Sequence, residues 1–247
     1  MAVYFASDFH LGLDKPKSSK DREKIIIKWL DSIQSDADEI YLLGDIFDYW
    51  FEYKNVVPKG YTRLFAKLAE FTDSNILVHI FTGNHDMWMF GYLEEELGIT
   101  LYREPKLKTI HDKIFLLGHG DGLGPGDQGY KFIKKVFASK INQWLFARIH
   151  PNTGIWLMKK FSQKSRESEK EVIPFLGPEK ERLLQYAEQK VKSTYFDFCI
   201  FGHRHLPIDH TLKNDKSRYI NTGDWFWHYS YARFDGQKLE LLKFAHE

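Results

Sequence analysis

The sequence predicts an α/β fold in which a layered sheet is flanked by helices. Short apolar runs recur along the chain, and each is followed by a polar cluster that contains Gly or Asp; the runs are residues 3–6, 40–43, 76–81, 114–117, 198–201 and 219–220. Runs that are apolar at nearly every position are typical of strands buried on both faces. Segments with helical spacing lie between several of them, and this alternation indicates an α/β sandwich with functional loops at the strand ends.

Three of the intervening segments have apolar residues at the spacing of an amphipathic helix. The three stripes are Ile26, Trp29, Leu30 and Ile33; Leu64, Phe65, Leu68 and Phe71; and Leu183, Leu184, Ala187 and Val191. Residues three and four apart lie on one helical face, so each stripe is expected to pack on a sheet.

The segment from 128 to 166 breaks the alternation. It has no acidic residue and many lysines and arginines, and one predicted helical face carries Phe132, Ile133, Val136, Phe137, Ile141, Trp144 and Leu145. We interpret residues of about 128–168 as a helical cap insert over the core, formed by a pair of helices that turn near residues 150–154. The alternative is a helical hairpin whose apolar stripe packs on the core and whose lysines are simply solvated.

Length and composition favour one intracellular domain. The chain has 247 residues, which fits a single domain over 1–247. The 35 Lys and Arg residues nearly balance the 34 Asp and Glu residues, which argues against nucleic acid as a partner. The single cysteine, Cys199, forms no internal disulfide, and the sequence shows neither a secretion leader nor a long apolar run. We therefore expect a cytoplasmic protein with at most peripheral membrane contact and no obligate protein partner.

Polar blocks follow five of the predicted strands. They are Asp8-Phe9-His10, Gly44-Asp45-Ile46-Phe47-Asp48, Gly83-Asn84-His85-Asp86, Gly118-His119-Gly120-Asp121 and Gly202-His203-Arg204-His205. Residues two apart in an extended segment point to the same side, so Asp8 with His10, and His203 with His205, are expected to present paired side chains to one site. The glycines allow sharp turns and close backbone approach.

The donor set of these blocks predicts a dinuclear metal site. Imidazole, carboxylate and amide oxygen without thiolate suit manganese, iron or zinc. The donors are too many for one catalytic ion, whereas two ions that share a carboxylate use them all and suit phosphoryl transfer. Each block alone also has a structural explanation, such as a turn or a cap, and Asp48 and Asp121 are as well suited to orienting neighbours as to binding metal. The joint occurrence of five blocks favours the metal site.

In order along the chain, the blocks match the pattern D-x-H, G-D-x-x-D, G-N-H-D, G-H and G-H-x-H, and the sequence therefore resembles the calcineurin-like metallophosphoesterase superfamily. The resemblance implies a β-sandwich flanked by helices with a helical cap insert. It implies one ion on Asp8, His10, Asp45 and His205, and a second ion on Asp45, Asn84, His119 and His203. It also implies that His85 contacts the phosphoryl group and protonates the leaving oxygen, so that His85 and the bridging Asp45 are the expected catalytic residues.

Within the superfamily, the chain resembles the UDP-2,3-diacylglucosamine pyrophosphatases of lipid A synthesis. The resemblance rests on residues 44–50, on residues 119–130 and on the basic aromatic insert that follows. It implies hydrolysis of a nucleotide-lipid pyrophosphate to UMP and 2,3-diacylglucosamine 1-phosphate. It also implies two divalent ions, expected to be Mn²⁺ with Fe²⁺ or Zn²⁺ as alternatives, and peripheral contact with the anionic cytoplasmic face of the inner membrane. The expected substrate contacts are Asp127, Tyr130, Lys164 and Arg166.

Two other functions are compatible with the same residues. One is a soluble phosphoesterase that acts on nucleotides or other small phosphodiesters, with the insert only covering the pocket. The other is a scaffold that has the fold without catalysis, although no expected ligand is missing. The aromatic residues 225–229 have no assigned role; core packing is the simplest, and rings beside a catalytic cleft are also able to line it.

Overall fold

Two β-sheets form the centre of the protein. The computed structural model describes the backbone of residues 1–167 and 174–245, and the side chains of residues 1–163 and 174–245. The first sheet has the order β11 (Leu239–Lys243), β10 (Ser230–Phe234), β1 (Ala2–Ala6), β2 (Ala37–Leu42), β3 (Leu77–Phe81) and β4 (Thr100–Tyr102). The second has the order β5 (Lys106–Ile110), β6 (Lys113–Leu117), β7 (Phe198–Phe201), β9 (Arg218–Thr222) and β8 (Pro207–Thr211).

Each sheet has a parallel centre and antiparallel margins. Strands β1 to β4 pair in parallel, as do β6, β7 and β9, whereas β10, β11, β5 and β8 add antiparallel neighbours. The carboxyl ends of parallel strands lie at one edge of a sheet, so the loops that follow β1, β2, β3, β6 and β7 gather on one side of the molecule.

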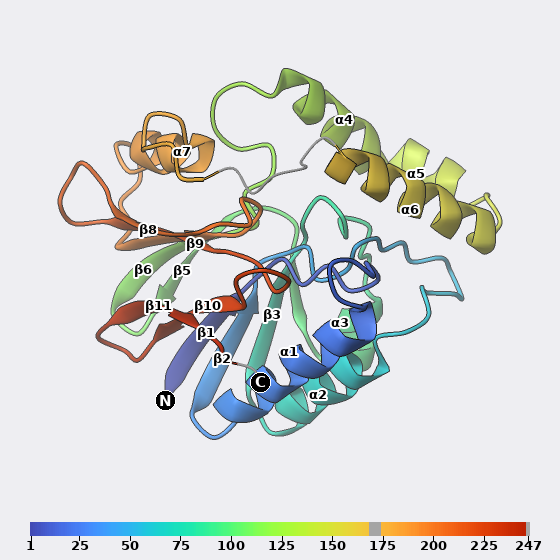
Figure 1. Ribbon diagram of the computed structural model, residues 1–247, viewed down its shortest axis with the longest axis horizontal. Coiled ribbons are helices and arrows are strands. Elements are labelled where there is room, and N and C mark those ends of the chain that lie inside the picture. The colour runs from blue at the N-terminus through green and yellow to red at the C-terminus, as the bar shows by residue number, and fades with distance from the viewer. Residues whose placement is uncertain (168–173, 246–247) are drawn as a thin grey trace.

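The sheets pack face to face, and helices cover their outer faces (Figure 1). Between the sheets, the rings of Phe5 and Phe115 stack with their centroids 5.6 Å apart. Helices α1 (Ser19–Ile33), α2 (Thr62–Asp73) and α3 (Tyr92–Leu97) cover the first sheet, and α7 (Arg182–Lys190) covers the second. Strand β1 is buried on both faces, because Val3 and Phe5 face the second sheet while Tyr4 faces the helices. The predicted α/β sandwich flanked by helices is confirmed.

Helix α1 shows how local sequence positions an outer layer. The Ser18 hydroxyl accepts a hydrogen bond from the backbone N–H of Asp21 and caps the helix. The predicted stripe of Ile26, Trp29, Leu30 and Ile33 is buried against the first sheet. Burial of one such face provides most of the stability of a helix of this length.

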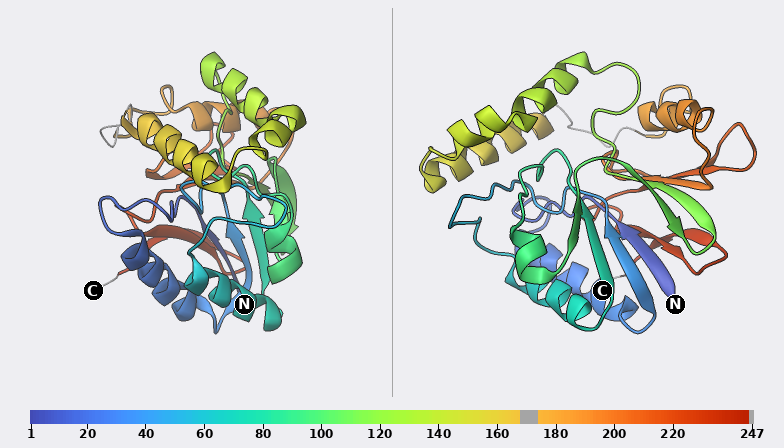
Figure 2. Two further views of the ribbon diagram at one scale, coloured as in Figure 1. Left: turned by 90° about the vertical axis from the view of Figure 1, so that its right-hand side faces the viewer. Right: turned by 180° about the vertical axis from the view of Figure 1, so that it is seen from behind.

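Three more helices lie over the side of the sandwich where the loops gather (Figures 1 and 2). They are α4 (Gln128–Ala138), α5 (Lys140–Phe146) and α6 (Pro151–Glu167). The turn between α5 and α6 spans residues 147–150, at the start of the expected position. Residues 151–154 are helical instead, because Pro151 occupies the first position of α6, where its missing N–H costs nothing. The first member of the expected pair is also divided, since Ser139 is extended between α4 and α5. Residue 168 of the expected insert lies outside the described residues.

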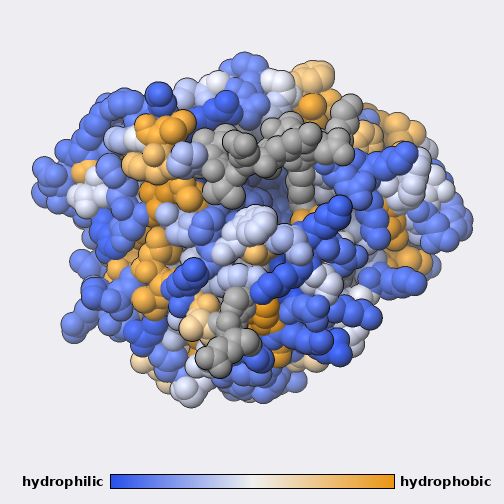
Figure 3. Space-filling model, in the orientation of Figure 1, coloured by the Kyte–Doolittle hydropathy of each residue, from blue (hydrophilic) through white to orange (hydrophobic). Residues whose placement is uncertain are grey.

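The apolar stripe of these helices is largely exposed. Phe132, Ile141 and Trp144 keep 68%, 71% and 56% of their surface accessible. At one edge of the stripe Phe137 packs on Trp88, as does Phe146 beside the stripe. In the space-filling view, apolar patches alternate with hydrophilic surface over this upper right region (Figure 3). The alternative of a stripe packed on the core is therefore wrong for most of its length.

Strands β4, β5, β8, β10 and β11 were not predicted. They lie toward the margins of the sheets, and polar residues interrupt their apolar residues, as in β10, where buried and partly exposed positions alternate. Such alternation is weaker in sequence than the continuous runs of central strands. Among the described residues, no helix is both long and apolar enough to span a bilayer.

Burial differences predict a stability contrast between two leucines in helices. Leu30 is fully buried in α1, whereas Leu145 in α5 is more than half exposed. Leu30→Ala should lower the free energy of unfolding by about 2–5 kcal/mol, because it leaves a cavity in the core. Leu145→Ala should change it by less than about 0.5 kcal/mol. Urea unfolding followed by circular dichroism measures both, and equal losses would contradict the packing described for α1 and α5.

Candidate metal centre

Backbone hydrogen bonds join four of the five sequence blocks in two pairs, one pair in each sheet. Asp8 donates its N–H to the carbonyl of Gly44 at 3.0 Å, and His10 donates to that of Asp45 at 2.9 Å. In the second sheet, Gly202 donates to the carbonyl of His119 at 2.9 Å. Loops from both sheets lie on the side of the sandwich that α4 to α6 cover (Figure 1).

The backbone of these loops differs from the extended form that the sequence suggested. Asp8, His10, Asp45, His203 and His205 all have left-handed φ angles of 57°, 44°, 53°, 67° and 56°. Tight turns, rather than the alternation of a strand, therefore aim the side chains. Left-handed non-glycine residues cost energy and persist where surrounding contacts hold them, which is common at functional sites.

One group of donors surrounds the Asp8 carboxylate. His205 Nε2 lies 3.1 Å from Asp8 Oδ1, and His10 Nε2 lies 3.7 Å from the same oxygen and 3.5 Å from Asp45 Oδ2. The carboxylates and His10 are buried. Asp8, His10, Asp45 and His205 are close enough to bind one cation together.

A second group shares Asp45. His119 Nε2 lies 3.4 Å from Asp45 Oδ2 and 3.2 Å from Asn84 Oδ1, and the His203 ring is 5.1 Å from the His119 ring. Asp45, His119 and His203 are close enough to bind a cation. His203 and His205 therefore belong to different groups, and Asp45 Oδ2 lies between His10 and His119, where a bridging ligand is required.

Two buried carboxylate oxygens test whether cations fit this arrangement. Among the described residues, Asp8 Oδ1 and Asp45 Oδ2 are shielded from solvent without a hydrogen-bond donor. A buried anionic oxygen without a donor is costly unless it is paired or coordinates a cation. The nearby donors are imidazole nitrogens and an amide oxygen, which suit manganese, iron or zinc. The residues present fit a pair of divalent ions.

Burial and neighbouring charges shift the pKa values of the groups in the centre. Burial alone would raise the pKa of Asp45, but the positive potential of His119 outweighs it and holds that pKa well below its usual range. Burial would lower the pKa of His119, yet Asp45 raises it to about 10. Burial and the charge of His119 lower the pKa of His203 to about 4, so this imidazole is neutral. A cation bound at His119 Nε2 would have to displace the proton that the raised pKa of His119 places there, as expected for a metal ligand.

Outer hydrogen bonds orient the histidine rings. His119 Nδ1 is 2.8 Å from the Leu43 carbonyl, to which it donates, so Nε2 is left as the ligand atom. His85 Nδ1 likewise donates to the Asp48 carbonyl at 3.0 Å, while the His85 N–H binds Asp45 Oδ1 at 2.9 Å. His85 thus lies against the loop that carries Asp45 and Asp48, and beside the His10 ring, with centroids 4.8 Å apart.

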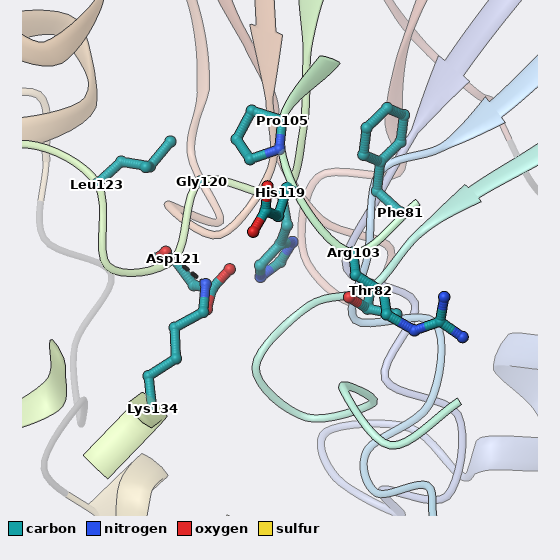
Figure 4. Close-up of a pocket in the computed structure, with 10 residues that line it drawn as sticks. Phe81, Thr82, Arg103, Pro105, His119, Gly120, Asp121, Leu123 and Lys134 are labelled. Carbon is teal, nitrogen blue, oxygen red and sulfur yellow. Dashed lines mark hydrogen bonds and ion pairs between the residues drawn. The ribbon is translucent and has the colours of Figure 1, made fainter. Parts of the chain in front are cut away.

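Asp48 and Asp121 connect the centre to the helices above it. Asp48 Oδ1 lies 3.5 Å from His10 Nδ1, and Asp48 Oδ2 accepts a hydrogen bond from Ser162 of α6 at 2.9 Å. Asp121 pairs with Lys134 of α4 at 2.6 Å beside His119, as Figure 4 shows. Both aspartates have orienting contacts, and Asp48 also lies near His10 and His85 in a third donor group.

Sequence reasoning assigned no role to two residues that hold the loops. Asp86 accepts hydrogen bonds from the N–H groups of Gly83 and Ile46, both at 2.7 Å, and of Phe47 at 3.3 Å. Arg22 is fully buried and donates to the carbonyls of Phe9, His10 and Leu13. Asp86 was visible as the last residue of its block, whereas nothing in the sequence distinguishes Arg22 from other helical arginines.

A cleft of about 1400 Å³ opens onto the centre, and one of the four expected substrate contacts lines it. Asp127 lines it and pairs with Arg182 at 2.9 Å. The Tyr130 hydroxyl donates to Asp121, and its ring is 6.4 Å from the His203 ring. The side chains of Lys164 and Arg166 lie outside the described part of the chain.

The three backbone contacts of Asp86 predict a large effect of a small substitution. Asp86→Asn replaces one of the two carboxylate oxygens with an NH₂ group. The remaining oxygen cannot accept from the N–H groups of both loops, and the NH₂ group then faces N–H groups that have lost their acceptor. We expect a loss of about 1–3 kcal/mol in unfolding free energy, because buried donors lose their acceptor, together with weaker metal binding. Asp112→Asn, in the exposed turn between β5 and β6, is the control. Denaturant melts and metal analysis of dialysed protein measure both, and full metal content in the Asp86 variant would contradict this role.

Comparison with known proteins identifies the family of this chain. The sequence profile of the calcineurin-like phosphoesterase family matches residues 1–207. The chain is 38% identical over 252 residues to the UDP-2,3-diacylglucosamine hydrolase of Porphyromonas gingivalis, a match that covers 97% of this chain and 96% of that protein. It is 25% identical over 244 residues to the enzyme of the same name from Shewanella halifaxensis, with 98% of each chain covered.

A solved structure adds a likeness at the level of the fold. The structure of an archaeal phosphodiesterase matches with a TM-score of 0.50 and 13% sequence identity, and the match covers 98% of this chain and 99% of that one. Profile, sequence relatives and fold agree with the resemblance found in the motifs. The chain belongs to the calcineurin-like phosphoesterase family.

Proposed function

We propose that this chain hydrolyses the pyrophosphate of UDP-2,3-diacylglucosamine to UMP and 2,3-diacylglucosamine 1-phosphate. Family membership makes it a metal-dependent hydrolase. The observation that carries the proposal is the pair of donor groups that share Asp45, at the base of a cleft large enough for a nucleotide-lipid. The relative from Porphyromonas gingivalis, which aligns over nearly the full length of both chains, supports this substrate.

The ligands of the proposed ions follow from the two groups. Asp8, His10, Asp45 and His205 would hold one ion, and Asp45, Asn84, His119 and His203 the other, with Mn²⁺ as the proposed metal and Fe²⁺ or Zn²⁺ as alternatives that suit the same donors. When bound, the ions supply Lewis-acid activation of water and neutralise charge on the pyrophosphate. The shared carboxylate of Asp45 sets their separation.

His85 acts on the transferring group in this proposal. Its Nδ1 is occupied by the Asp48 carbonyl, which leaves Nε2 as the polar atom available to substrate. His85 hydrogen-bonds the phosphoryl group and delivers a proton to the oxygen that leaves when the P–O–P bridge breaks. The backbone bond to Asp45 Oδ1 fixes its distance from the bridging ligand.

The exposed face of α4 to α6 suits the lipid half of the substrate. Phe132, Ile141 and Trp144 are exposed there, and basic side chains lie on the same helices, as in the contacts of Arg148 with the Trp144 ring at 4.6 Å and of Lys160 with the Trp156 ring at 4.2 Å. Apolar side chains bordered by cations bind acyl chains and anionic headgroups. The chain is therefore proposed to bind peripherally to the anionic cytoplasmic face of the inner membrane, where its substrate lies.

Loss of the shared carboxylate should abolish hydrolysis. Asp45→Ala removes a ligand of both ions, so we expect UMP release from UDP-2,3-diacylglucosamine with Mn²⁺ to fall on the order of a thousandfold or more. Circular dichroism should show the fold retained, and Asp73→Ala, an exposed position in α2, should keep full activity. Dinucleoside polyphosphate and an aryl phosphodiester are assayed beside the lipid. Turnover of only these soluble substrates by the wild-type protein would overturn the lipid assignment.

The proposed membrane contact predicts that a charge in the exposed stripe weakens vesicle binding. Ile141→Glu places a charge in the exposed stripe and should weaken binding to phosphatidylglycerol-containing vesicles about tenfold, since one buried aliphatic side chain is lost. Leu77→Glu is the matched control, because Leu77 is 55% exposed at the opposite end of β3 from the loops. Vesicle co-sedimentation measures both variants. Equal binding by the two would exclude the α4–α6 face as the membrane surface.

A further inference from the structure

Three consecutive aromatic residues after β9 lie in three different environments. Trp225 is fully buried against Trp29, with ring centroids 4.7 Å apart. Phe226 packs against the His10 and His205 rings at 5.6 and 5.3 Å. Trp227 is 54% exposed and lines the cleft. Core packing therefore accounts for the first ring and support of the metal ligands for the second, but neither accounts for the third.

The turn that carries Trp227 is held rigidly. The buried carboxylate of Asp224 accepts hydrogen bonds from the N–H groups of Phe226 at 3.2 Å, Trp227 at 2.8 Å and His228 at 2.9 Å. With Trp225 in the core on one side, the backbone of Trp227 is fixed before any ligand binds. A ring presented in this way binds a flat partner at low entropic cost.

We propose that Trp227 stacks on the uracil base of the substrate, and this inference rests on the proposed function. The Phe226 ring lies between His205 and Trp227, with its centroid 5.3 Å from the former and 6.4 Å from the latter. A nucleotide whose phosphate lies at the ions carries its base one ribose away. On the protein, only the Phe226 ring separates Trp227 from His205, a ligand of the centre. Trp227 is therefore placed where the base of such a nucleotide would lie.

The surroundings of Trp227 favour a base over an acyl chain. The loop after β1 lines the same cleft as Trp227, and it carries Asp14 and Lys15 beside Leu13 and Pro16. Arg22 ties this loop to the aromatic turn, because it donates to the Leu13 carbonyl and lies 5.9 Å from the Phe226 ring. An indole ring with charged side chains in the same cleft suits a heterocycle with polar edges. The continuous apolar surface that acyl chains need is on α4 and α5.

Direct binding tests the assignment without relying on turnover. UMP and ribose 5-phosphate, which lacks only the base, are titrated into Mn²⁺-loaded protein by calorimetry. Trp227→Leu should raise the Kd of UMP about tenfold and leave the Kd of ribose 5-phosphate unchanged, because only the stacking contact is lost. Trp227→Phe should keep the Kd of UMP within about threefold of the wild type. Tyr195→Leu, an exposed ring outside the cleft lining, should change neither Kd.

Other outcomes identify which idea has failed. An unchanged Kd of UMP in Trp227→Leu, or equal increases for both ligands, overturns base stacking. An increase in the Kd of 2,3-diacylglucosamine 1-phosphate alone assigns Trp227 to the lipid instead and also overturns it. Failure of the proposed function is separate, because it is seen as absent UMP release by the wild-type protein in the hydrolysis assay.

Discussion

The Asp45 carboxylate is the constraint around which the site is organised. It is almost completely buried, and its Oδ2 faces His10 at 3.5 Å and His119 at 3.4 Å. A buried carboxylate is unfavourable unless positive charge or hydrogen bonds compensate for its lost hydration. Oδ1 obtains such a bond from the His85 N–H, whereas Oδ2 is directed to the space between the two donor groups. The fold thus holds an anion at the one place where it serves both groups.

The two-sheet architecture makes this burial possible. Loops after parallel strands of one sheet contribute Asp8, Asp45 and Asn84, and loops of the other contribute His119 and His203. Neither sheet alone supplies a complete set. An added Cβ at Gly44 would lie 2.7 Å from His119 Nδ1, so the sheets approach closely only because this residue is glycine.

The sequence predicted the chemistry of the centre better than its geometry. The motif blocks contain the donor types, and central strands such as β1 are apolar at every position, so both were recognised. The left-handed turns at Asp8 and His205 were missed, because no local pattern distinguishes them from strand ends. The role of Arg22 was also missed, because its acceptors are backbone carbonyls that become adjacent only in the folded chain. Strands such as β10 have mixed polarity and gave no continuous signal.

The centre and the helices above it are also mechanically linked. Asp48 contacts His10 and also accepts the hydroxyl of Ser162 in α6, so one carboxylate joins a donor group to a helix of the lipid-facing region. Asp121, which follows His119, is paired with Lys134 of α4. A shift of α4 or α6 would move these carboxylates, and ring orientation in a metal site depends on such outer contacts. A ligand that shifts either helix would therefore also act on the side chains that orient the histidine rings.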